Sequence, residues 1–184
     1  GLPYVVAGRA LYDTLEVRDL AALVRLVLEP SDRRALAHVL RGPLVALSEG
    51  GLLSLFRDEE GRPFAFDLHG SVLDRAAFPE EAARLETFRR RFAEVRPTLL
   101  RLRAPEALRR AMQWFDLDRV TAALPRAAPR LGNLDRLVHI AQERGGSLFS
   151  FSRWLERRIA DETDEPEAVV FSAEDDAIRL LTIH

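Results

Sequence analysis

The residue types that most often perform chemistry do not converge on a site in this sequence. There is no cysteine, so thiolate zinc sites, cysteine nucleophiles and disulfides are excluded. The histidines show no metal-ligand spacing with carboxylates, and neither glycine doublet precedes the Lys-Ser/Thr pair of a phosphate-binding loop. These residues are His38, His69, His139, His184, Gly50-Gly51 and Gly145-Gly146. We expect no catalysis, cofactor or metal in this segment by itself, and its acidic clusters are explained better as a solvated connector.

Arginine is the second chemical feature. All 27 basic residues are Arg, and codon bias in a GC-rich genome accounts for that total better than selection for phosphate contacts. Only local clustering is informative. Between Arg84 and Arg110 there are nine Arg and three acids, whereas between Ile159 and Ile178 there are eight acids and no Arg.

The most basic run within this stretch is Arg89-Arg90-Arg91. At ~100° per residue these side chains fan around a helix. A solvated helix surface, with pairs such as Arg90 with Glu94, and a phosphate-contacting patch explain the run equally well. On the second interpretation Arg89 and Arg90 are candidate DNA-binding residues, and a salt-dependent affinity for DNA separates the two interpretations.

The composition is that of one soluble globular domain, with 184 residues of which 47% are apolar and 30% charged. The net charge of −2 provides no global positive field for nucleic acid. The apolar runs are shorter than the ~18 residues of a membrane span, and no basic-then-apolar leader opens the sequence. We expect a cytoplasmic protein with no membrane partner.

The elements that must position these residues are mostly helical. Apolar residues recur at helical spacing, and Pro, Ser, Asp, Asn and Gly mark the ends. The predicted helices span 15–28, 32–41, 48–56, a stretch from Pro79 past Val95, 105–115, 117–124, a stretch from an Asn133 cap to Gly145, and a stretch from Ser147 to Ile159. Strands are expected at 4–6 and 177–183, and a weaker one at 64–68. The predicted fold is mainly α, with a short strand at each end.

Both ends of the chain carry specific motifs. Residues 2–8 read Leu-Pro-Tyr-Val-Val-Ala-Gly, residues 12–19 read Tyr-Asp-Thr-Leu-Glu-Val-Arg-Asp, and residues 178–184 read Ile-Arg-Leu-Leu-Thr-Ile-His. The first two resemble the point in UvrD-like superfamily 1 DNA helicases where the chain leaves motor subdomain 2A for the 2B insertion. The third resembles the start of the motif V strand. Segments 40–48 and 133–137 are similar to the RecB/AddA (exodeoxyribonuclease V beta-like) branch.

The resemblance implies a single helical domain over residues 1–184. Residues 13–176 would be the 2B-type body, and 1–12 and 177–184 would be stubs of subdomain 2A that lie close together. The parent would be an ATP-dependent DNA helicase/exonuclease of double-strand-break repair, with ATP and magnesium bound elsewhere in it. The implied partners are DNA, motor subdomains 1A and 2A, and a second protein of AddB/RecC type.

The resemblance also implies DNA-binding residues. His184 matches a DNA-contacting histidine of motif V, and Thr182 precedes it in the same strand. Arg41 and Ser48 belong to the interior segment that is similar to the RecB/AddA branch. Ala46 departs from the pattern, because helicases of this kind often have glycine there. Alanine pays a strain penalty at positive φ and obstructs a backbone grip on phosphate.

Other functional classes remain open at this point. The residues include no Walker A lysine, Walker B acids, arginine finger or nuclease motif, so the resemblance implies a fragment without ATPase, helicase or nuclease activity of its own. The alternative is a helical protein–protein interaction module with no DNA contact. A small free-standing enzyme would need a convergent polar pocket, which the sequence does not indicate.

Overall fold

The structure, a computed structural model, describes residues 4–6, 11–56, 68, 73–160 and 178–180. Across these ranges the chain forms eight α-helices, so the prediction of a mainly α fold is confirmed. The elements are β1 (Tyr4–Val6), a 3₁₀ turn (Leu11–Asp13), α1 (Leu15–Leu28), α2 (Arg33–Arg41), α3 (Glu49–Phe56), α4 (Pro79–Leu99), α5 (Ala104–Trp114), α6 (Leu117–Ala122), α7 (Ala127–Arg144), α8 (Leu148–Ala160) and β2 (Ile178–Leu180). None of the described helices is long and apolar enough to cross a membrane.

Local sequence explains several helix ends. Asp32 caps α2, because its Oδ1 accepts the N–H groups of Arg34 and Ala35 at 2.9 Å each. Helix α4 begins at Pro79, whose missing N–H costs nothing in a first turn. Helix α7 ends at Gly145, which has a φ of 64°. These ends agree with the sequence predictions.

The start of α7 corrects one prediction. The sequence suggested that Asn133 caps this helix, but α7 begins at Ala127 and the Asn133 side chain is buried within it. Its Nδ2 donates to Glu16 Oε1 of α1 at 2.7 Å, so the polar group serves a contact between helices. Pro129 does not interrupt α7 because it lies in the first turn, where the N–H groups have no intrahelical acceptor.

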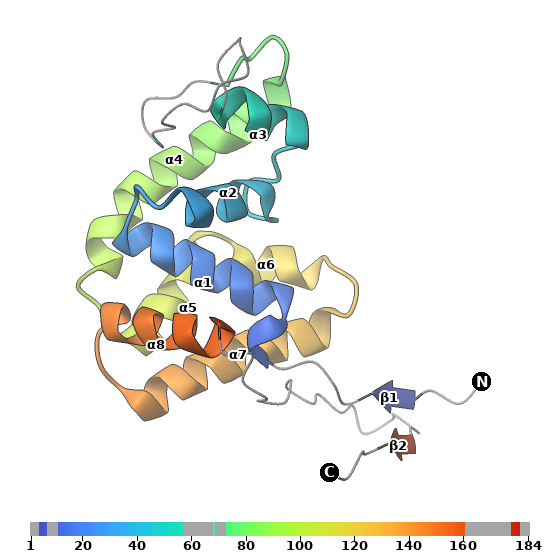
Figure 1. The fold of residues 1–184 in the computed structure, drawn as a ribbon, viewed down its shortest axis with the longest axis vertical. Coiled ribbons are helices and arrows are strands. Elements are labelled where there is room, and N and C mark those ends of the chain that lie inside the picture. The colour runs from blue at the N-terminus through green and yellow to red at the C-terminus, as the bar shows by residue number, and fades with distance from the viewer. Residues whose placement is uncertain (1–3, 7–10, 57–67, 69–72, 161–177, 181–184) are drawn as a thin grey trace.

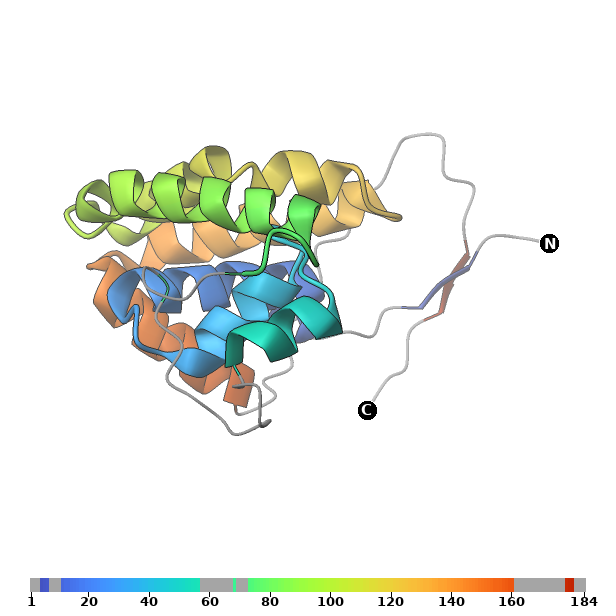
Figure 2. The same cartoon turned by 90° about the horizontal axis from the view of Figure 1, so that it is seen from above.

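Helix α1 is the centre of the helical body (Figure 1). It packs against α2, α4, α5, α7 and α8. Four of its apolar side chains have no exposed surface: Val17, Leu20, Leu23 and Leu26. Helix α3 and the start of α4 lie at one end of the body, and α7 and α8 lie at the other end. Figure 2 shows α4 along one side, with α2 and α3 on the opposite side of α1.

Strands β1 and β2 pair with each other in parallel, with Tyr4 opposite Ile178. The pair lies beside the helical body (Figures 1 and 2). That the two strands belong to the sheet of a motor subdomain stays a prediction. The weaker strand predicted at 64–68 lies, apart from the buried Leu68, outside the described residues.

Candidate functional site

The turn between α2 and α3 contains two of the predicted DNA-binding residues. Arg41 is the last residue of α2, Ser48 immediately precedes α3, and both are exposed. Between them, Ala46 has a φ of 55°, in the left-handed region. The strain expected of a non-glycine residue at this point is therefore built into the turn.

Ser48 caps α3, as the sequence predicted. Its Oγ accepts the Gly51 N–H at 3.1 Å, and its carbonyl accepts the Leu52 N–H at 2.9 Å. The first N–H groups of a helix carry partial positive charge and favour anions. In this chain the anion is Glu81 of α4, whose Oε2 accepts the Ser48 N–H at 3.0 Å. Gly51 leaves room for this carboxylate, because a Cβ atom at residue 51 would overlap it.

Arg84 of α4 braces the same turn. Its Nε donates to the Val45 carbonyl at 2.8 Å, and its Nη2 donates to the Ala46 carbonyl at 2.9 Å. Arg84 follows Glu81 by three residues, a spacing that places both side chains on one face of α4. Within the turn, the Ala46 N–H donates to the Gly42 carbonyl at 2.8 Å. Hydrogen bonds from its own backbone and from α4 therefore both fix the conformation of this turn.

A groove of about 340 Å³ adjoins the turn. Residues of α4, α6 and the connecting segments line it, among them Leu44, Arg84, Phe88, Arg91, Phe115 and Val120. Arg91 Nη1 lies 2.6 Å from Asp116 Oδ2 at the same groove. The groove thus offers two guanidinium groups beside aliphatic and aromatic side chains. Within the described residues, no group of three or more metal-ligating side chains is found.

Helix α4 separates the consecutive arginines, as the helical period predicts. Arg90 is exposed, whereas the Arg89 side chain is only 11% exposed and lies 4.0 Å from Glu86 Oε2. Arg90 also lies about 9 Å further along α4 than Arg84, at 1.5 Å per residue. Direct DNA contact by Arg89 or Arg90 stays a prediction.

Sequence reasoning missed both α4 residues that hold the turn. The Pro79-Glu80-Glu81 start indicated only acids that suit the N-terminus of their own helix. No local pattern predicts that Glu81 accepts an N–H group 33 positions earlier in the chain. The one available signal was that Arg84 opens the arginine-rich stretch. Thr182 and His184 lie outside the described residues, so their DNA contacts stay predictions.

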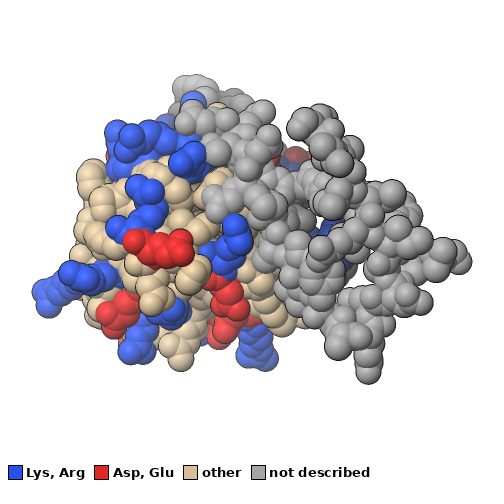
Figure 3. Space-filling model, turned by 90° about the horizontal axis from the view of Figure 1, so that it is seen from below, with Lys and Arg blue, Asp and Glu red and all other residues tan. Residues whose placement is uncertain are grey.

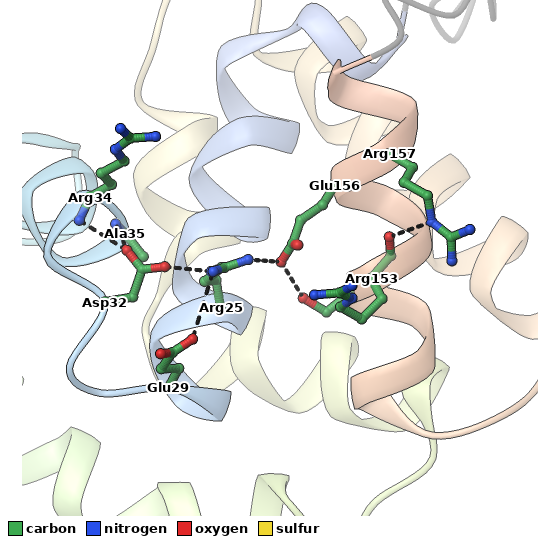
Figure 4. Close-up of polar contacts among 9 residues, drawn as sticks. Arg25, Glu29, Asp32, Arg34, Ala35, Arg153, Glu156 and Arg157 are labelled. Atoms are coloured by element: carbon green, nitrogen blue, oxygen red, sulfur yellow. Dashed lines mark hydrogen bonds and ion pairs between the residues drawn. The ribbon is translucent and has the colours of Figure 1, made fainter.

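A second polar cluster ties three helices together around Arg25 of α1 (Figure 4). Arg25 Nη1 lies 2.6 Å from Glu156 Oε1 of α8, and Nε lies 2.5 Å from Asp32 Oδ2. The Glu156 and Asp32 carboxylates raise the pKa of Arg25 above its usual value. Burial alone would raise the pKa of Asp32, but the Ala35 N–H and the Arg25 guanidinium outweigh it and lower that pKa. The cluster therefore joins α1, α2 and α8 as charged groups at neutral pH.

A third cluster brings together two segments that carry the resemblance, 12–19 and 133–137. Glu16 of α1 is buried, and its Oε2 lies 2.9 Å from Arg130 Nη1 of α7. The other carboxylate oxygen, Oε1, accepts the hydrogen bond from Asn133. In the described structure these residues hold α7 against α1.

Arginine is spread over the surface at the α7–α8 end of the body. Figure 3 shows this face from below, with Arg side chains separated by acidic and uncharged ones rather than gathered in one patch. Two Arg side chains lie over the ring of Trp154, with Cζ 4.3 Å away for Arg144 and 5.7 Å for Arg158. These cation–π contacts attach the end of α7 to α8.

Comparison with known proteins supplies the decisive observation. The chain is 26% identical over 191 residues to a protein of Lysinibacillus sphaericus, and the match covers 100% of the chain. It is 28% identical to a protein of Heliobacterium modesticaldum over 98% of its length, and 27% identical to one of Levilactobacillus brevis over 100%. All three relatives are named as the AddA subunit of an ATP-dependent helicase/nuclease. The chain is homologous to AddA.

The resemblance to the RecB/AddA branch is thereby confirmed at the level of AddA. The matched region is short relative to AddA as a whole, because the chain spans 14–15% of the length of these three relatives. A scan for family models found none that matches the chain.

Proposed function

We propose that this chain is the 2B-type accessory subdomain of an ATP-dependent DNA helicase/nuclease of double-strand-break repair and recombination. The observation that carries the proposal is the alignment of nearly the whole chain with a short segment of AddA. A mainly helical body whose terminal segments pair with each other is consistent with an insertion into another subdomain.

In this proposal the chemistry belongs to other parts of the longer protein. ATP and magnesium bind there, with strand separation and cleavage. Motor subdomains 1A and 2A and a second protein of AddB/RecC type are the proposed protein neighbours, in the cytoplasm. The role of the helical body is to flank incoming duplex DNA.

The proposed DNA contact is the α2–α3 turn. Backbone N–H groups at the start of α3 suit a phosphate, and the exposed guanidinium of Arg41 adds a charge at the end of α2. A contact of this kind positions the duplex without reading its sequence, because it involves only the phosphate backbone. The expected binding is therefore independent of sequence and weakens with salt.

Fluorescence anisotropy of labelled forked DNA tests this proposal at two salt concentrations. The substitution Arg41→Gln should weaken binding several-fold at low salt and reduce the salt slope by about 1, because one phosphate contact is lost. Arg33→Gln is the matched control, since Arg33 is an exposed arginine at the opposite end of the same helix. It should leave the affinity and the slope unchanged.

Absence of binding by the unsubstituted chain at low salt would overturn the DNA contact. That result would favour the alternative, a helical protein–protein interaction module within the same helicase/nuclease. Equal losses in the two variants would show that the chain binds through its overall charge and not through the turn.

A further inference from the structure

Ala46 adopts a conformation that alanine rarely adopts without help. Its φ of 55° places the Cβ atom close to a backbone oxygen, a strain that glycine does not have. The strain can persist only where surrounding contacts determine the conformation. The source of those contacts in the described structure is the first part of α4.

Arg84 grips both peptide planes that flank Ala46. The carbonyl of Val45 belongs to the plane before Ala46, and the carbonyl of Ala46 belongs to the plane after it. One guanidinium donates to both, from Nε at 2.8 Å and from Nη2 at 2.9 Å. Because a peptide unit is planar, holding these two oxygen atoms restricts both φ and ψ of Ala46.

We propose that Arg84 is a positioning residue for the α2–α3 turn, which holds Ala46 in its left-handed conformation and so sets the direction in which α3 presents its first N–H groups. The DNA-binding part of this inference rests on the proposed function. The planar fork of arginine is essential to it, since a lysine ammonium is a point charge on a flexible stem. Glu80 competes weakly for Arg84, because it lies 3.8 Å away and is 91% exposed.

A double-substitution cycle tests the proposal with anisotropy of forked DNA. Arg84→Ala and Arg84→Lys should each weaken binding roughly tenfold, because the turn leaves its left-handed conformation. Ala46→Gly alone should bind within about twofold of the unsubstituted chain, since glycine populates this region without strain. Combined with Arg84→Ala, it should restore most of the affinity.

The Lys variant and the rescue separate positioning from charge. If Arg84 acts only as a cation, Arg84→Lys should bind normally and Ala46→Gly should rescue nothing, which would overturn the inference. Arg84 is 42% exposed, so the helical body should tolerate its replacement, and far-UV circular dichroism checks this.

Amide hydrogen exchange of Leu47 and Ser48 gives a readout that does not depend on DNA. In Arg84→Ala both amides should exchange faster, and adding Ala46→Gly should return them toward the original rate. Unchanged exchange in Arg84→Ala would overturn the positioning role even if DNA binding fell. Conversely, altered exchange in a chain that never binds DNA would retain the positioning role and reject the proposed function.

Discussion

The Glu81 carboxylate lies at the start of α3 where, under the proposed function, a phosphate group of DNA would bind. We predict that Glu81→Gln raises the affinity for forked DNA roughly threefold at low salt. The amide still offers an oxygen to the Ser48 N–H but no longer repels phosphate. Anisotropy titrations measure the change.

Glu80→Gln is the control for this prediction. It removes the same charge one residue away, from a side chain that is 91% exposed and has no bond to the turn. Its affinity should change much less. Equal gains in the two variants would mean that Glu81 acts through general repulsion and not by occupying the N-terminus of α3.

Residue by residue, local chemistry was predictable and distant contacts were not. The Ser48 cap and the cost of alanine at position 46 depend on residues a few positions apart, and both predictions agree with the structure. Glu81 and Arg84 reach the turn only because α4 folds back across it. Arg89 shows the same limit, since its sequence neighbours do not reveal that its side chain is mostly buried.

The start of α2 is the element whose stability should depend most clearly on pH. The pKa of Asp32 is lowered in the folded chain, so its carboxylate stabilises the fold above the unfolded value of about 3.9. This contribution is lost as the pH falls through the lower folded pKa. We predict that Asp32→Asn lowers the free energy of unfolding by about 1 kcal/mol at pH 7, because Asn keeps the cap and loses the Arg25 ion pair.

Urea unfolding at pH 7, 5 and 3 measures this difference, which should shrink below about pH 4 as the Asp32 carboxylate takes up its proton. Asp118→Asn, an exposed acid in the first turn of α6, should have little effect at any of these pH values. A constant difference between Asp32→Asn and the original chain at all three pH values would contradict the ion-pair explanation.

At the scale of elements, apolar spacing and end signals predicted the helices well. The exception is the first turn of α7, where Pro129 and an expected Asn133 cap suggested a later start. Proline in a first turn is compatible with a helix, and Asn133 is required by the buried Glu16 on another helix. A signal for tertiary pairing was thus mistaken for a local cap.

The whole helical body should unfold as one unit, because α5 and α8 both pack against α1. The two tryptophans of the chain, Trp114 at the end of α5 and Trp154 in α8, report on these helices separately. We predict that Trp114→Phe and Trp154→Phe show urea transitions, followed by the remaining tryptophan, that each coincide with their own far-UV circular dichroism. A fluorescence transition at a clearly different midpoint in either variant would indicate two cooperative units.

The central place of α1 was not predictable from the sequence. Each helix shows which of its faces is apolar, but these stripes do not say which helix lies against which. Composition had a similar limit for charge. The net charge of −2 is a sum over an arginine-rich stretch and an acidic one, so it says little about any single surface.

The brace from Arg84 to Ala46 has an evolutionary consequence. A turn held from outside no longer needs glycine at its left-handed position, so the two sites are released from independent selection and become linked. Among relatives, arginine at the site of Arg84 is expected wherever position 46 carries a side chain, and is dispensable wherever glycine remains. The order of change is also constrained, because a lineage that gains alanine before the arginine passes through a strained intermediate.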